Sequence, residues 1–182
     1  MLSNIKTPED ILDFMKSHIK YGWLDINNEE HIGNMKDFRR VYRTSNIEEV
    51  LEHGLGCCIE QVYLMHYLLD SIGVENKMFC TRVYEADNFN DLDANERMHC
   101  FILYYLDGRV HQIEHPNWER IGIHHFDTEE QAISEINKIY EEMSEGIIRP
   151  VTQFYEVEYG LSFKEFNAYI NSLDEYNMKK SL

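Results

Sequence analysis

Residues 54–73 read GLGCCIEQVYLMHYLLDSIG, and this stretch sets the centre of the fold. Its apolar side chains recur at steps of four, three, four and three, the spacing of one helical face: Cys58, Val62, Met65, Leu69 and Ile72. Two glycines precede the cysteine pair, and Gly73 follows the last apolar residue, as is typical of helix ends. The spacing predicts a helix that begins at Cys58, with Cys57 at the position before it.

The next segments of the chain are typical of an antiparallel sheet. Residues 77–84 and 98–106 are rich in aromatic and β-branched side chains, and Asp107-Gly108 is a two-residue turn signal that leads into a third strand at 109–115. Residues 85–97 are polar and mostly acidic, so we expect a surface loop there, with a substrate-gating lid as the alternative. The sequence therefore predicts an α+β fold in which a cysteine-bearing helix packs on an antiparallel sheet.

Both flanks of this core carry helical signals. Thr7 and Pro8 predict the start of a helix that runs to about Lys20. Residues 21–46 are mixed in pattern, with short helical turns predicted at 35–42, and a further helix is predicted at 45–52. After the core, the patterns predict a helix from Asp127 to about Gly146, a strand at 151–159, a helix from Ser162 and a loose tail at 178–182.

The length and composition fit one globular domain. The chain has 182 residues, of which 43% are hydrophobic and 27% are charged. We expect a single domain over 1–182, with its core at about 54–118, a helical flank at 1–53, and helices and a strand at 119–182. No stretch approaches the roughly 20 consecutive apolar residues that a membrane span needs, and the N-terminus lacks the apolar run of a signal peptide. The expected location is the cytoplasm.

Charge and cysteine content exclude several classes of partner. Seventeen Lys and Arg against 33 Asp and Glu give a formal net charge of −16, which repels nucleic-acid phosphates and anionic lipid surfaces. We therefore expect no nucleic-acid partner and no membrane partner. The cysteines are too few for a disulfide scaffold and form no CxxC pair, so reduced thiols are expected at all four positions: Cys57, Cys58, Cys80 and Cys100.

The start of the central helix is a place where a thiol can become a nucleophile. Unpaired N–H groups and aligned peptide dipoles at a helix N-terminus favour the thiolate and lower the pKa of a cysteine there. Cys58 occupies this position, and its helical face directs the sulfur toward the sheet. Cys57, at the cap position, is the weaker candidate. The alternative interpretation is that Cys58 is a small buried residue without chemistry.

The hairpin register brings a histidine and a carboxylate together. If Asp107 and Gly108 form the loop, counting back along both strands places His99 opposite Pro116 and makes Glu114 its diagonal neighbour on the same sheet face. A diagonal gap of roughly 6 to 8 Å allows the longer glutamate side chain to reach an imidazole. The prediction depends on the two-residue turn, because a change of one residue would separate the two side chains.

A cysteine at a helix start, a histidine on a strand and an acidic residue on the next strand, in that chain order, resemble the transglutaminase-like superfamily of papain-like thiol enzymes. The resemblance spans about 54–118 and rests on three segments: Gly56-Cys57-Cys58-Ile59-Glu60-Gln61, His99-Cys100-Phe101 and Ile113-Glu114-His115-Pro116. In the third segment most members of the superfamily have Asp-Pro, whereas this chain has Glu114 as its acidic residue. The flanks at 21–25 and 122–123 are similar to those of a small bacterial subgroup that favours Glu.

The resemblance implies roles for three residues. Cys58 would be the nucleophile, His99 the general base and acid, and Glu114 the group that orients the imidazole. An oxyanion hole would use the Cys58 backbone N–H and one further donor. Three side chains are candidates for that donor: Trp23, Tyr21 and Gln61. This chemistry requires no cofactor and no metal.

The predicted function is thiol-dependent acyl transfer, with hydrolysis of an amide or peptide bond through a Cys58 thioester as the preferred outcome. The expected partner is a peptide, protein or other amide-containing substrate, and the oligomeric state stays open. The alternatives are acyl transfer to an amine, including protein cross-linking, and a non-catalytic binding module that keeps the cleft.

A third alternative is a metal-binding protein built on clustered histidines: His111, His115, His124 and His125. The chain has no HExxH motif, and the predicted register puts His111 and His115 on the sheet face away from His99. Scattered polar and packing histidines are therefore the preferred interpretation.

Overall fold

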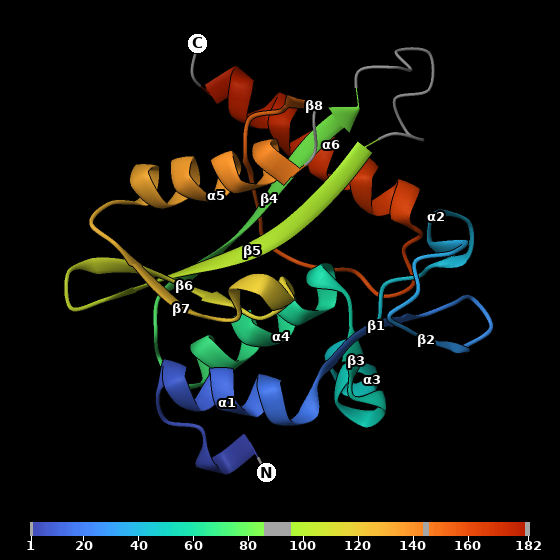
Figure 1. The fold of residues 1–182 in the computed structure, drawn as a ribbon, viewed down its shortest axis with the longest axis horizontal. Coiled ribbons are helices and arrows are strands. Elements are labelled where there is room, and N and C mark those ends of the chain that lie inside the picture. Colours follow the sequence, from blue (N-terminus) through green and yellow to red (C-terminus); the bar gives the residue numbers. More distant parts are fainter. Residues whose placement is uncertain (1, 86–95, 144–145, 181–182) are drawn as a thin grey trace.

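The computed structural model describes residues 2–85, 96–143 and 146–180 (Figure 1). Its helices are η1 (Leu2–Asn4), α1 (Pro8–His18), α2 (Phe38–Val41), α3 (Ile47–His53), α4 (Cys58–Ser71), η2 (Trp118–Arg120), α5 (Glu129–Met143) and α6 (Phe163–Lys180). Its strands are β1 (Lys20–Leu24), β2 (Glu30–Ile32), β3 (Leu55–Gly56), β4 (Asn76–Glu85), β5 (Glu96–Leu106), β6 (Arg109–Glu114), β7 (Gly122–Phe126), β8 (Gly146–Ile148) and β9 (Thr152–Phe154).

The large sheet is antiparallel and has the order β7-β6-β5-β4-β8, with β9 also paired to β4. The predicted two-residue turn is confirmed, since Leu106 pairs with Arg109. Asp107 and Gly108 have φ angles of 53° and 74°, the left-handed pair that a tight hairpin turn of this kind requires. The register predicted from that turn is therefore the register of the sheet.

Helices cover both faces of this sheet (Figure 1). On one face α4 packs against alternate residues of β5, Cys100, Ile102 and Tyr104, and α1 lies beside α4 and also contacts β6 and β7. On the other face α5 covers the residues between them, Phe101 and Leu103. Each fully buried aliphatic or aromatic side chain of this kind contributes about 1.5–3 kcal/mol. The predicted α+β arrangement, a cysteine-bearing helix on an antiparallel sheet that bears the histidine and the acid, is confirmed.

Helix α4 begins at the residue that the sequence predicts. Cys57 is its N-cap, and the Glu60 carboxylate accepts a hydrogen bond from the Cys57 N–H at 3.0 Å, which closes a capping box. Gly54 ends α3 in the left-handed conformation with φ 62°, and a Cβ at this position would lie 2.7 Å from the His18 carbonyl oxygen. Gly54 thus turns the chain tightly into β3 and α4.

The N-terminal flank differs from the expected helical one. Helices α1, α2 and α3 lie where helical signals predict them, but β1, β2 and β3 form a second sheet of order β2-β1-β3. Strand β1 runs parallel to β3, with Tyr21 paired to Gly56 just before the cysteines. These strands escaped prediction because β2 and β3 are only three and two residues long, and β3 is distant in sequence from its partner β1.

The C-terminal flank also needs correction. The predicted strand at 151–159 is only β9, because the chain leaves β4 after Phe154, and β7 was not predicted at all. Helix α6 continues to Lys180, so the predicted loose tail at 178–182 is wrong as far as 180, and 181–182 lie outside the described residues. In the expected loop or lid at 85–97, residues 86–95 lie outside them as well.

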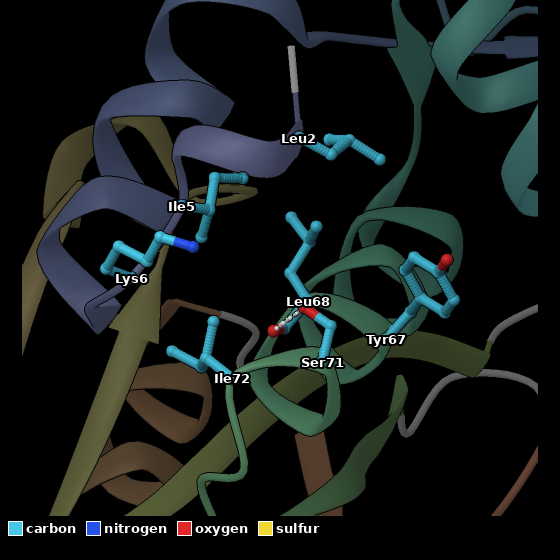
Figure 2. A pocket seen from close by; sticks show the side chains of 7 residues that line it. All are labelled: Leu2, Ile5, Lys6, Tyr67, Leu68, Ser71 and Ile72. Carbon is cyan, nitrogen blue, oxygen red and sulfur yellow. Dashed lines mark hydrogen bonds between the residues drawn. The ribbon is translucent and has the colours of Figure 1, made fainter.

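A surface pocket of about 380 Å³ lies between the N-terminal segment and the second half of α4 (Figure 2). Its lining consists of Leu2, Ile5, Lys6, Tyr67, Leu68, Ser71 and Ile72. At a rise of 1.5 Å per residue, the α4 positions in this lining are roughly 14–20 Å along the helix from Cys58. The pocket is therefore separate from the cysteine. Of the helices described, none is both long and apolar enough to cross a membrane.

Candidate active site

Cys58 is the first residue of α4 and retains a small exposed area, with 7% of its surface accessible. Its backbone and sulfur therefore lie where the unpaired N–H groups and the positive end of the helix dipole are strongest. Cys57 is 1% exposed, and its sulfur lies 3.8 Å from the Tyr42 hydroxyl. All four cysteines are free thiols. Of the cysteine pair, Cys58 is the one with surface to offer a substrate.

The structure brings His99 and Glu114 together, as the register predicts. The His99 Nε2 lies 3.3 Å from the Glu114 Oε2, and both side chains are buried. His99 lies on β5 and Glu114 is the last residue of β6. Since Nε2 faces the carboxylate, Nδ1 is the ring nitrogen left to exchange a proton with another group.

Two further donors hold the Glu114 carboxylate in place. The Gln112 side-chain amide donates to Oε2 at 2.8 Å, and the Asn117 backbone N–H donates to Oε1 at 2.9 Å. Gln112 lies two residues back on the same strand face, and Asn117 begins the turn after Pro116. A buried carboxylate with hydrogen bonds to both oxygens has a fixed orientation toward its histidine.

The end of β6 explains how Cys58 and His99 meet although strand alternation places them on opposite faces. His99 belongs to the face covered by α5, whereas Cys58 approaches from the face covered by α4. Strand β6 ends at Glu114, and the position opposite His99 falls on Pro116, which has no N–H to continue the ladder. Among the described pairings, β5 thus has no neighbour on this side at His99, and the thiol and the ring can interact past the edge.

The electrostatics of the site favour a charged pair. Side-chain hydrogen bonds with Cys100 and Cys57, and then the hydrogen bond and charge of His99, lower the pKa of Cys58 well below that of an ordinary thiol, despite its burial. Burial alone would lower the pKa of His99, but the Glu114 carboxylate and the interaction with Cys58 outweigh it and raise that pKa to about 9. Both shifts favour the charged forms of the two side chains, a thiolate beside an imidazolium.

Three residues of the site were not predicted from the sequence: Gln112, Asn117 and Tyr140. The Tyr140 ring of α5 stacks on the His99 ring, with centroids 4.3 Å apart and an angle of 23° between the planes. The Asn117 side chain donates a hydrogen bond to the Tyr140 hydroxyl at 3.4 Å. Helical spacing marks Tyr140 as part of a buried face, but nothing in the sequence indicates that this face meets His99.

Of the three predicted candidates for the second oxyanion donor, two already donate a hydrogen bond to a backbone carbonyl. The Trp23 Nε1–H donates to the Asn34 carbonyl at 2.8 Å, and the Gln61 amide donates to the Gly56 carbonyl at 2.7 Å while its oxygen contacts His115. Trp23 therefore has no N–H left to donate, whereas Gln61 keeps its second amide N–H. The Tyr21 residue is partly exposed, but desolvation of its hydroxyl and then the negative charge of Cys58 raise its pKa, so the hydroxyl stays protonated.

The histidines named as possible metal ligands do not gather at the thiol site. His115 Nδ1 lies 2.6 Å from the Gln61 Oε1 on the α4 side, and His111 stacks on Tyr104 on that same face, as the register predicts. His111 also contacts His125, ring nitrogen to ring nitrogen, at 2.6 Å. Within the described residues, three ligand atoms of metal-binding type come close together at Asp25, Glu29 and His31, where the Asp25 carboxylate already accepts two backbone N–H groups.

Comparison with known proteins gives structural likeness only. No protein-family model matches the chain, and no curated protein matches its sequence. Among solved structures the chain is similar to the (BACCR)NAT3 arylamine N-acetyltransferase of Bacillus cereus, which is reported to have a unique Cys-His-Glu catalytic triad. The two sequences are 18% identical, the match covers 61% of this chain and 42% of that chain, and the TM-score is 0.37. Arylamine N-acetyltransferase C of Bacillus anthracis gives 16% identity, the same coverage and the same TM-score. The chain thus spans less than half the length of either enzyme.

Proposed function

We propose that this protein is a thiol acyl-transfer enzyme in which Cys58 is the nucleophile, His99 the general acid and base, and Glu114 the residue that orients His99. The observation that carries the proposal is the arrangement itself: a thiol at a helix start whose histidine partner is held by a buried carboxylate at 3.3 Å. Cys58 lies at a helix start, His99 contacts a carboxylate, and that carboxylate accepts two further hydrogen bonds. The preferred reaction is hydrolysis of an amide or peptide bond in a peptide, protein or other amide-containing substrate of the cytoplasm.

The catalytic cycle begins from the thiolate and imidazolium pair. The Cys58 sulfur attacks the acyl carbon, and the carbonyl oxygen becomes an oxyanion. His99 Nδ1–H then gives its proton to the leaving amine as the carbon–nitrogen bond breaks, which leaves a Cys58 thioester and a neutral imidazole. The neutral imidazole next takes a proton from water as the water attacks the thioester. Release of the acid restores the thiolate and the imidazolium.

Tyr21 is the side chain that we assign to the second place in the oxyanion hole, beside the Cys58 backbone N–H. Strand β1 pairs Tyr21 with Gly56, two residues before the nucleophile. Within the described part of the chain no hydrogen bond occupies the Tyr21 hydroxyl, whereas Trp23 and Gln61 are engaged with carbonyl groups. A phenol with a raised pKa remains a donor throughout the working pH range.

The proposal is tested by trapping the thioester. Wild-type protein is mixed with p-nitrophenyl acetate, quenched in acid and mapped by mass spectrometry, beside Cys58→Ala and Cys80→Ala. Cys80 is the control because it is also a buried free thiol, it lies on the neighbouring strand β4, and its sulfur lies 3.7 Å from the Thr81 carbonyl oxygen. We expect the acetyl group on Cys58 in wild type and in Cys80→Ala, and no turnover in Cys58→Ala.

The same assay separates the alternatives. Addition of a primary amine reports acyl transfer if the acetylated amine accumulates faster than acetate, and hydrolysis if it does not. A folded wild-type protein that is not acylated at Cys58, or a Cys58→Ala variant that turns over like wild type, would contradict the enzyme proposal and favour a binding module.

A further inference from the structure

The aromatic ring above His99 belongs to Tyr140, near the C-terminal end of α5. The two rings are stacked rather than edge to face, with the centroid distance and angle given above. Tyr140 belongs to α5, whereas Cys58 belongs to α4 and Glu114 to β6. His99 is therefore fixed on one edge by its carboxylate and on one face by an aromatic ring.

Asn117 ties the ring to the carboxylate. Its backbone N–H donates to the Glu114 Oε1 at 2.9 Å, and its side-chain amide donates to the Tyr140 hydroxyl at 3.4 Å. One residue of the turn after β6 thus holds both groups that contact His99. Burial, then the charge of Glu114, raises the pKa of Tyr140, so the phenol stays neutral and its ring face keeps its partial negative charge.

We propose that Tyr140 is a positioning residue of this thiol site, whose ring keeps the His99 imidazole turned toward Glu114 and stabilises its protonated form through a cation–π contact. The inference deepens the proposed function and rests on it for its catalytic meaning. Stabilising the imidazolium also stabilises the thiolate beside it, because each charge favours the other.

The contact has a measurable consequence for the histidine. An aromatic face beneath a protonated histidine stabilises the charged ring and raises the pKa of that histidine by roughly 0.5 to 1.5. Replacing the ring by an aliphatic side chain should therefore lower the pKa of His99 from its value of about 9 by that amount. Removing only the hydroxyl should change it far less, since the π face remains.

The test is an NMR titration of the His99 ring, assigned by its loss in His99→Gln, in four proteins: wild type, Tyr140→Phe, Tyr140→Leu and Tyr105→Leu. Tyr105 is the matched control, because it packs against the same apolar cluster under α5 but has its hydroxyl on Glu129 and no ring contact with His99. We expect the His99 midpoint of Tyr140→Phe and Tyr105→Leu to stay near that of wild type, and the midpoint of Tyr140→Leu to fall.

Two outcomes overturn the inference: a folded Tyr140→Leu that titrates like wild type, or a Tyr105→Leu that shifts as far as Tyr140→Leu. If Tyr140→Leu does not fold, Tyr140→Met, which keeps more of the side-chain length, replaces it and is held to the same expectation. The titration requires no turnover. A protein that fails the acylation test but shows the Tyr140-dependent shift would disprove the enzyme proposal and leave the ring contact standing.

Discussion

The lowered pKa of Cys58 comes from the side chains around it as well as from its place at a helix start. The helix start is a general reason for a lowered thiol pKa, but hydrogen bonds with Cys100 and Cys57 and the charge of His99 are specific to this fold. The raised pKa of His99 in turn depends on Glu114, whose carboxylate is held in place by Gln112 and by the Asn117 N–H. Each of these groups therefore helps to keep the pKa of Cys58 low, either directly or through His99.

Replacing Glu114 by glutamine tests this dependence. The amide keeps the shape of the side chain but carries no charge, so it cannot favour the imidazolium or select the histidine tautomer as a carboxylate does. We expect Glu114→Gln to fold and to lose acyl-transfer rate by up to about 10⁴-fold, the order found for the acid of a serine-protease triad. Steady-state hydrolysis of p-nitrophenyl acetate measures the rate.

His115→Ala is the control for this variant. His115 follows Glu114 directly, but its ring contacts Gln61 on the opposite side of the sheet and does not reach His99. We expect a far smaller change in rate. If His115→Ala loses as much activity as Glu114→Gln while both remain folded, Glu114 is not the specific orienter of His99.

At the scale of secondary-structure elements, local sequence signals were sufficient to predict strand pairing where two strands are joined by a tight turn. Asp107-Gly108 determines the β5–β6 pairing, and that pairing places Glu114 beside His99 without any long-range information. Residues 115–121, which connect β6 to β7, carry no such two-residue turn signal, and β1 and β3 are far apart in the sequence. The distance between β1 and β3 in the sequence also hides the pairing of Tyr21 with Gly56, just before the two cysteines.

The junction of α3, β3 and α4 gives a prediction at this scale. Gly54→Ala must adopt φ near 62° and place a Cβ 2.7 Å from the His18 carbonyl oxygen. A left-handed conformation costs a residue with a Cβ about 1–2 kcal/mol, and the steric contact adds to it, so we expect the free energy of unfolding to fall by about 2–4 kcal/mol. Urea denaturation measures the loss.

Gly73→Ala is the matched control for the junction. Gly73 ends α4 with φ 73°, but no atom lies within 4 Å of the place of its Cβ. Its loss should therefore reflect the backbone conformation alone, at about 1–2 kcal/mol. Equal losses for Gly54→Ala and Gly73→Ala would show that the close approach to His18 has no energetic role.

At the scale of the whole molecule, the site forms where three layers meet at the end of the inner strand β6. Helix α4 supplies Cys58 from one face, β5 and β6 supply His99 and Glu114, and α5 supplies Tyr140 from the other face (Figure 1). The helix start and the strand register were predictable because each is local. The contact of α5 with His99 was not, because helical periodicity defines a buried face without naming what it covers.

The central claim is that Cys58 exists as a thiolate paired with the His99 imidazolium, and the pH dependence of its alkylation tests it most directly. The rate constant for iodoacetamide at Cys58, followed by mass spectrometry from pH 4 to 10, reports the fraction of thiolate in wild type and in His99→Ala. Because the pKa of Cys58 is lowered, wild type should already react at a near-constant rate at neutral pH, with a change only near pH 9 as His99 loses its proton. In His99→Ala the thiolate loses its cation, so the rise should move to higher pH. Coincident profiles that both rise near the pKa of an ordinary thiol, about 8.5, would contradict the ion pair and the enzyme proposal built on it.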